Sequence, residues 1–202
     1  MIFSVGALIL LILFTITVHE YAHGLVAFFR GDKTAHLAGR LTLNPLRHID
    51  PLWTVLLPLL LIAAGLPAIG MARPVPVNFM NLRRPKRDMV WVALAGPLAN
   101  VLFAFLLAFL YRRTLGGLWL LGAYMNLGLA LFNLMPVPPL DGSRVLLGLL
   151  PLRWAREYVK MERFGFVIVL ALVALGWMGR ILVPAINAVA VLLGLPAIQE
   201  AG

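Results

Sequence analysis

The chain has 202 residues, of which 62% are apolar and only 12% are charged, and it contains no cysteine. Soluble domains are nearer half apolar and a quarter charged, so this composition excludes a soluble globular protein, a disordered chain and a disulfide scaffold. The net charge of +9 comes from 17 Lys and Arg against 8 Asp and Glu. These basic residues stand in short gaps between apolar runs, which is typical of a polytopic membrane protein and does not indicate nucleic-acid binding.

The apolar runs predict an all-α polytopic membrane protein with a single membrane-embedded domain over residues 1–202. The first run has neither the basic start nor the small-residue cleavage site of a signal peptide, so we expect a retained helix over residues 1–29. The other predicted elements, in chain order, are a strand-like polar segment over 30–50, a re-entrant or short helix over 51–72, helices over 89–111 and 114–142, and C-terminal helices over 164–199.

Two polar stretches differ from ordinary connectors. The alternation of apolar and polar residues from Arg40 to Asn44 favours a short membrane-associated β-strand or hairpin, which Pro45 would end. Residues 73–78 are expected to be extended because the stretch contains two prolines. Surface connectors without a further role are the alternative for both stretches.

Ionisable residues within an apolar run are functional candidates, because a charge inside a bilayer is costly. The first run contains His19, Glu20 and His23 in an HExxH pattern. Residues four apart lie on one helical face, so both imidazoles can bind one metal ion. Glu20 is next to the first imidazole and can accept a proton from an activated water molecule. A structural pair of histidines on one helix face is the alternative.

Two histidines leave a zinc site short of a third protein ligand. Asp141 stands at the end of a long apolar run, in a proline-rich stretch that cannot form a regular helix. Irregular backbone at membrane depth is buried in protein or lines a wet cavity, so Asp141 is well placed to complete a His2Asp site. The alternative for Asp141 is a helix N-cap that faces the lipid headgroups.

The remaining polar residues have simpler expectations. Asn126 and Asn133 can form hydrogen bonds between helices, and the sequence from Gly96 to Asn100 permits close helix packing. His36 and His48 lie in the polar segment after the first helix and are predicted to be loop residues.

With both motifs in view, the chain resembles the site-2 protease family of intramembrane zinc metalloproteases. HExxH at residues 19–23 and NxxPxPPLDG at residues 133–142 occur in the family's order, and residues 95–100 match its intervening helix. The gaps are too short for a PDZ domain, so the resemblance is to a minimal branch. It implies one Zn²⁺ per chain held by His19, His23 and Asp141, with Glu20 as the general base. It also implies that Asn133 positions the substrate or stabilises the oxyanion.

The His pair and Asp141 must lie at one depth for such a site to form. If every apolar run crossed the membrane once, Asp141 would reach the opposite side, so residues 51–72 are expected not to cross. Fourteen Lys and Arg residues then lie on the side of Arg30, and only Arg112 and Arg113 lie on the other side. The positive-inside rule makes the first side cytoplasmic, with the protein in the cell membrane and its metal centre near the cytoplasmic leaflet.

The implied partners are the lipid bilayer and transmembrane protein substrates. A helical substrate hides its peptide bonds and must unwind, and a strand over Arg40, Leu41, Thr42, Leu43 and Asn44 would pair with the unwound chain. A membrane metal-ion binding or transport protein is the alternative function, although no inverted repeat is visible. The sequence does not predict the substrate or the oligomeric state.

Overall fold

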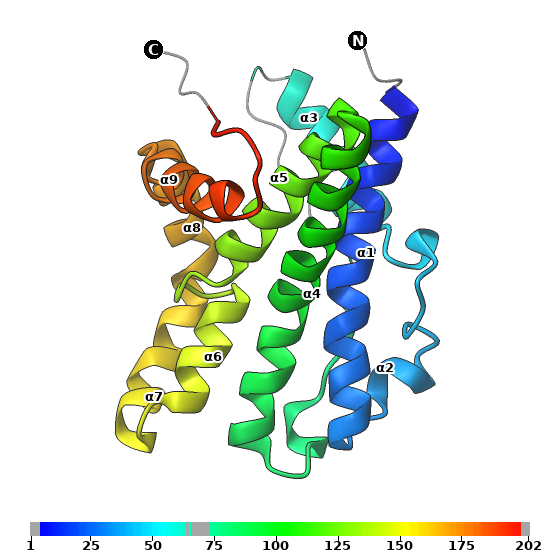
Figure 1. The fold of residues 1–202 in the computed structure, drawn as a ribbon. Coiled ribbons are helices and arrows are strands. Elements are labelled where there is room, and N and C mark those ends of the chain that lie inside the picture. Colours follow the sequence, from blue (N-terminus) through cyan, green and yellow to red (C-terminus); the bar gives the residue numbers. More distant parts are fainter. Residues whose placement is uncertain (1–4, 64, 66–72, 199–202) are drawn as a thin grey trace.

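A computed structural model describes residues 5–63, 65 and 73–198, and these residues are organised as a bundle of helices (Figure 1). The prediction of an all-α membrane protein is confirmed for this part of the chain. The α-helices are α1 (Val5–Arg30), α2 (Thr34–Leu37), α3 (Leu57–Ala63), α4 (Pro85–Thr114), α5 (Gly117–Asn133), α6 (Asp141–Leu149), α7 (Leu152–Val159), α8 (Gly165–Ala174) and α9 (Trp177–Leu192). The shorter turns are 3-10 helices at Pro45–Arg47, Phe79–Asn81 and Lys160–Phe164, and a π-helix at Pro51–Leu56.

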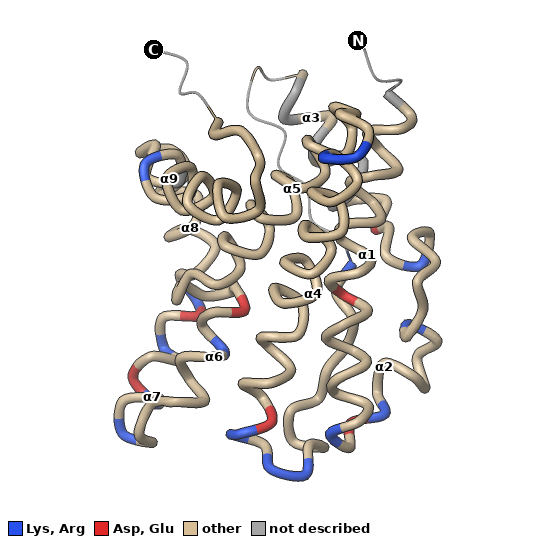
Figure 2. The backbone as a smooth tube through the Cα atoms, in the orientation of Figure 1, with Lys and Arg blue, Asp and Glu red and all other residues tan. Residues whose placement is uncertain are grey.

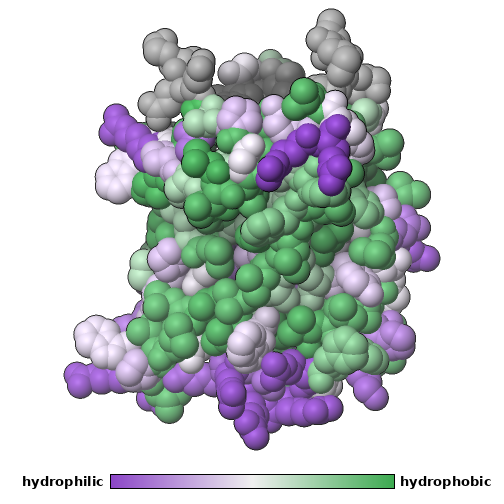
Figure 3. All heavy atoms as spheres, in the orientation of Figure 1, coloured by the Kyte–Doolittle hydropathy of each residue, from purple (hydrophilic) through white to green (hydrophobic). Residues whose placement is uncertain are grey.

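Two helices, α1 and α4, are long and apolar enough to cross a bilayer. A third candidate is the run from Leu152 to Ala174 together with residues 179–192, which bends by 81°. Large apolar side chains such as Leu102, Phe105 and Phe109 are more than half exposed, and apolar residues cover most of the face in Figure 3. Lipid contact accounts for an apolar surface of this size, so the protein is a multi-pass membrane protein.

Helix α4 lies at the centre of the bundle and contacts α1, α5 and α6. Small side chains on the facing surfaces of α4 and α5, including Ala104, Ala108 and Ala123, are almost completely buried. Membrane helices associate through close packing at such residues because lipid offers no hydrophobic driving force. This packing fixes α4 as the wall against which the other functional elements lie.

The end of α1 and the start of α4 are joined by a buried carboxylate. Asp88 is 2% exposed and accepts hydrogen bonds from Arg30 Nη1 at 3.0 Å and from the Arg84 backbone N–H at 2.9 Å. The backbone N–H of Arg83 also donates to the carbonyl of Arg30 at 3.0 Å. A buried carboxylate is stable only when it is paired in this way. The two helices are therefore antiparallel, and basic residues gather at this shared end (Figure 2).

Asp32 holds residues 78–81 beside the end of α1. Its buried carboxylate accepts hydrogen bonds from the backbone N–H of Asn78 at 2.7 Å, from Asn81 Nδ2 at 3.1 Å and from the Thr34 hydroxyl at 2.5 Å. Burial raises the pKa of Asp32, but these hydrogen bonds stabilise the charged form and together leave the pKa below its ordinary value. This contact fixes one end of the segment that precedes α4.

The prediction of a β-strand over Arg40–Asn44 is wrong, because the described residues contain no strand. The Thr42 hydroxyl accepts a hydrogen bond from the Asn44 backbone N–H at 3.1 Å, and Asn44 Oδ1 accepts one from the Leu46 N–H at 3.0 Å. Side chains that bond to backbone two residues ahead form turns in place of a strand ladder. The alternation of residue types therefore belongs to successive turns that lead into the 3-10 helix Pro45–Arg47.

The range 51–72 includes residues 64 and 66–72, which lie outside the described part of the chain. Its described part contains the π-helix Pro51–Leu56 and α3. The backbone N–H of Arg73 donates to the carbonyl of His48 at 2.9 Å, so the two flanks of this range lie side by side. Further along, α5 ends at Asn133 and α6 begins at Asp141, with turns over the prolines between them.

Candidate metal centre

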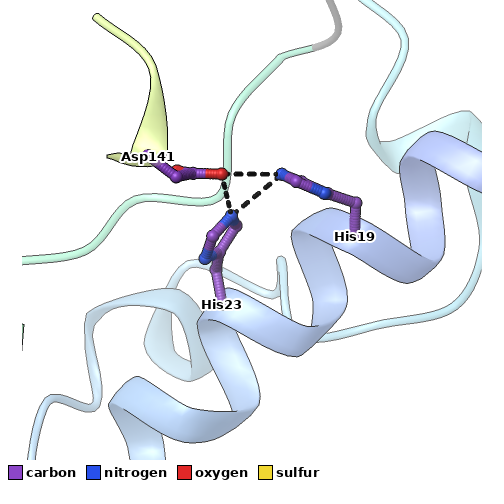
Figure 4. A group of neighbouring side chains, drawn as sticks. All are labelled: His19, His23 and Asp141. Carbon is purple, nitrogen blue, oxygen red and sulfur yellow. Dashed lines mark hydrogen bonds and ion pairs between the residues drawn. The ribbon is translucent and has the colours of Figure 1, made fainter. Parts of the chain in front are cut away.

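Two histidines from α1 and one aspartate from the start of α6 lie close together (Figure 4). The Nε2 atoms of His19 and His23 are 3.0 Å apart, and Asp141 Oδ2 lies 3.1 Å from the first and 3.2 Å from the second. Tetrahedral zinc with bonds of about 2.0–2.1 Å separates its ligand atoms by about 3.3 Å. The spacing of these three atoms therefore fits one zinc ion to within a few tenths of an ångström.

The hydrogen bonds of His23 favour metal binding at Nε2. Its Nδ1 lies 2.7 Å from the carbonyl oxygen of Val92, which can only accept, so Nδ1 carries the proton and Nε2 presents a lone pair. The Nδ1 of His19 lies 2.5 Å from Asn100 Oδ1. With the Asp141 carboxylate, the cluster brings acceptor atoms together in a largely enclosed place, where a bound cation would offset their mutual repulsion.

Glu20 faces the same cavity as the three clustered residues. This cavity has a volume of about 310 Å³ and is lined both by polar residues and by apolar residues, the latter called the apolar wall here. The polar lining includes His19, Glu20, His23, Asn133 and Asp141, and the apolar wall includes Pro74, Val75, Val77 and Phe79. The backbone N–H of Val75 donates to Glu20 Oε2 at 2.8 Å and holds the carboxylate in place.

Gly142 explains how the irregular stretch before α6 presents Asp141. A Cβ atom at residue 142 would lie 2.2 Å from the carbonyl oxygen of Leu134, so only glycine allows this close backbone approach. Leu140 is the N-cap residue of α6, and Asp141 follows it as the first residue of the helix. Asp141 points to the histidines, so the alternative of a simple N-cap does not describe it.

Gly96 is a site residue that the sequence analysis assigned to helix packing. A Cβ atom at this position would lie 2.4 Å from His23 Nε2 and 2.7 Å from His19 Nε2. The backbone of α4 therefore touches the two nitrogens that face Asp141. The signal in the sequence was the four-residue spacing of Gly96 and Asn100, which places both on one helical face.

The other predicted site residues are further from the cluster. Asn133 lines the cavity, but its Nδ2 donates one hydrogen bond to Leu129 O of its own helix at 2.9 Å. Residues 40–44 are not among the described residues that line the cavity, and their role in substrate binding stays a prediction. His48 Nε2 lies 3.0 Å from Thr42 O, and His36 is exposed on α2, so both are outside the cluster.

Comparison with known proteins identifies the family. A family model described as "Peptidase family M50" matches residues 111–176, which include Asn133 and Asp141. The chain is 37% identical over 195 residues to "Putative zinc metalloprotease YwhC" of Bacillus subtilis (strain 168), and the match covers 90% of this chain and 86% of that protein. The chain belongs to peptidase family M50. The resemblance drawn from the two motifs is thereby confirmed, and this M50 protein is a zinc metalloprotease.

Two further relatives have names of the same kind. The chain is 33% identical over 180 residues to "Putative zinc metalloprotease Rip2" of Mycolicibacterium smegmatis, covering 83% of this chain and 68% of that protein. It is 45% identical over 60 residues to "Putative zinc metalloprotease MJ0611" of Methanocaldococcus jannaschii, covering 27% of this chain and 31% of that protein. The comparison with solved structures found no match.

Proposed function

We propose that this M50 metalloprotease is an endopeptidase that hydrolyses peptide bonds of transmembrane substrates within the bilayer. The depth of the cluster carries this proposal. Arg30, at the end of α1, follows His19 by eleven positions, which corresponds to about 16.5 Å along the helix. A bilayer core is about 30 Å thick, so the cavity lies where a membrane-embedded segment reaches it more readily than a soluble protein.

In this proposal His19, His23 and Asp141 hold one zinc ion per chain. Bound zinc would supply Lewis-acid chemistry, polarising the scissile carbonyl and lowering the pKa of a water molecule from ~15.7 to about 7. Glu20 accepts the proton of the attacking water and returns it to the leaving amine. The Val75 N–H keeps the Glu20 carboxylate turned toward the cavity during both transfers.

Substrate positioning is assigned to the cavity lining. A side-chain amide has two N–H groups, and Asn133 commits one to Leu129 O, so the second is available to the developing oxyanion. The apolar wall of Val75, Val77 and Phe79 suits the apolar side chains of a membrane-spanning substrate. The expected pairing of a substrate with Arg40–Asn44 depended on a β-strand edge, and these residues form turns instead. The residues of the apolar wall are therefore better placed to contact a substrate.

We also propose the orientation in the membrane. The hydrogen bond between Arg73 and His48 supports a segment that enters and leaves on one side, so α1, α4 and α5 would form the three crossings of the core. Basic residues gather at the Arg30 end, which would face the cytoplasm (Figure 2). Because the chain has no cysteine, Arg83→Cys and Arg113→Cys each introduce a unique label site. An impermeant thiol reagent applied outside cells should label only position 113, and labelling of position 83 alone would reverse the orientation.

The decisive test of the proposed activity is cleavage of single-span substrates in proteoliposomes. Glu20→Gln should retain zinc and reduce cleavage by about 100-fold or more, because general acid–base catalysis contributes about 10²–10⁴-fold. Glu157→Gln is the matched control, since Glu157 is exposed and its carboxylate pairs with Lys160. Cleavage by Glu20→Gln at the wild-type rate would reject Glu20 as the base.

The position of the cut separates intramembrane proteolysis from cleavage of exposed loops. Mass spectrometry of the products should place the cut within the apolar span of the substrate, toward its cytoplasmic end. Cuts confined to loops outside the bilayer would contradict the proposal and leave a surface-acting metalloprotease.

A further inference from the structure

A chain of buried amides crosses the bundle from α5 to the metal centre. Asn126 on α5 and Asn100 on α4 are both 0% exposed. Asn100 Nδ2 lies 2.7 Å from Asn126 Oδ1, and Asn100 Oδ1 lies 2.5 Å from His19 Nδ1. Thr15, one turn before His19 on α1, contacts both amides and is also buried.

Two backbone carbonyls fix the direction of every hydrogen bond in this chain. One end of the Asn126 amide lies 2.9 Å from Gly122 O, which can only accept, so that end is the NH2 group and the other end is Oδ1. Asn126 Oδ1 and Thr15 O, at 3.2 Å, both face the same end of the Asn100 amide, which must therefore be its NH2 group. The oxygen of Asn100 is then the atom that faces His19.

We propose that Asn100 and Asn126 are positioning residues that fix the proton of His19 on Nδ1 and so reserve its Nε2 lone pair for a metal ion. The inference depends on the proposed function only in taking zinc as the ion that His19 binds. The direction of the hydrogen bonds follows from the protein groups alone. Both residues act through His19 and touch neither substrate nor the reacting atoms.

The comparison with His23 explains why side chains are needed at His19. The Nδ1 proton of His23 is held by the carbonyl of Val92, a backbone group that no substitution removes. Around His19 the described acceptor for Nδ1 is a side chain, Asn100. If that acceptor were lost, the proton could move to Nε2 and point into the cluster. Association of α4 with α5 would require only the contact between Asn100 and Asn126, and it leaves the contact of Asn100 Oδ1 with His19 Nδ1 unexplained.

The first test determines which nitrogen of His19 carries the proton. Metal-free protein labelled with ¹⁵N-histidine is studied by NMR at pH 9, well above the ordinary imidazole pKa of about 6.5, and the His19 signals are assigned with His19→Ala. The wild type should show Nδ1 protonated. Asn100→Leu should move the proton to Nε2 in a large fraction of molecules.

The second test measures zinc affinity by competition with a chromogenic chelator. Asn100→Leu should weaken zinc binding about 10–100-fold, the usual effect of losing such a partner of a metal-binding histidine. Asn187→Leu is the matched control, because it also replaces a helical asparagine. Asn187 forms hydrogen bonds with the backbone of Ile198, away from the metal centre, and zinc affinity should not change.

A wild-type protein with bare Nδ1 on His19 would overturn the inference without any variant. So would a folded Asn100→Leu protein that keeps the Nδ1 proton and the wild-type zinc affinity, which would indicate packing alone. If Asn100→Leu does not fold, Asn126→Leu replaces it in both tests. This variant keeps the contact between Asn100 and His19, so it should weaken zinc binding by less than the loss expected for Asn100→Leu. Neither measurement depends on cleavage, so failure of the proposed protease activity would leave this inference standing.

Discussion

Replacement of Gly96 by alanine is the smallest change that should disable the metal centre. The added methyl group would lie 2.4 Å from His23 Nε2 and 2.7 Å from His19 Nε2, the two atoms proposed to bind zinc. Alanine favours helix more than glycine does, so the substitution does not weaken α4 itself. The expected defect therefore comes from displacement of the two imidazoles.

The size of the defect follows from the overlap. For an ordinary contact of at least 3.4 Å, His23 Nε2 must move by about 1 Å and His19 Nε2 by about 0.7 Å. Overpacking of this kind costs about 1–3 kcal/mol, and each 1.4 kcal/mol corresponds to tenfold in affinity. We therefore expect zinc binding to weaken by about 5- to 150-fold, with a matching loss of cleavage at limiting zinc.

Zinc affinity in detergent, measured by chelator competition, tests this prediction, and thermal unfolding of the same samples reports whether the fold is intact. Gly128→Ala is the matched control, because its methyl group would meet Ile186 at 3.6 Å, an ordinary contact. A folded Gly96→Ala protein with wild-type zinc affinity would refute the reasoning, since it would mean that the imidazoles do not bind the ion where the structure places them.

Three further predictions concern the groups around the site. Asp141→Asn keeps the shape of the side chain but removes its charge. Zinc affinity should fall by more than about 100-fold, the upper end of the loss seen when a hydrogen-bond partner of a metal ligand is removed, and an unchanged affinity would exclude Asp141 as a ligand. Val75 lies between two prolines, and Val75→Pro removes the N–H group that donates a hydrogen bond to Glu20. The cleavage rate should fall by about 10-fold or more while zinc affinity stays unchanged. A loss of zinc affinity as large as the loss of cleavage would indicate instead that the segment is displaced. Because the pKa of Asp32 in the folded protein is lower than its ordinary value of 3.8, the charged carboxylate stabilises the fold at pH values above 3.8. This stabilisation is lost as the pH falls below 3.8 toward the pKa of the folded state. Thermal unfolding from about pH 6 to about pH 3 should show this loss in the wild type and a flatter profile in Asp32→Asn, and identical profiles would contradict it.

The parts of the site that depend on local spacing were predictable from the sequence. His19 and His23 are one helical turn apart, so their convergence follows from helix geometry alone. Asp141 required a further step, because only the proline-rich stretch before it indicated irregular backbone at membrane depth. The structure brings all three together, with their ligand atoms within 4.8 Å of one another.

The parts that depend on which helix faces meet were not predictable. Gly96 and Asn100 share a face of α4, but a single apolar helix carries no sign of which neighbour that face contacts, so both residues were assigned to packing. The strand expected at Arg40–Asn44 failed for a different reason. Alternation of apolar and polar residues does not distinguish a strand from turns in which Thr42 and Asn44 bond to nearby backbone.

The central claim is that His19, His23 and Asp141 bind one zinc ion between α1 and α6. An anomalous difference map recorded at the zinc absorption edge from crystals of the zinc-loaded protein tests it most directly. The account predicts a single strong peak about 2.0–2.2 Å from Nε2 of each histidine and from a carboxylate oxygen of Asp141. A peak bound by other residues, or none at this cluster in protein that is active and zinc-loaded, would contradict it.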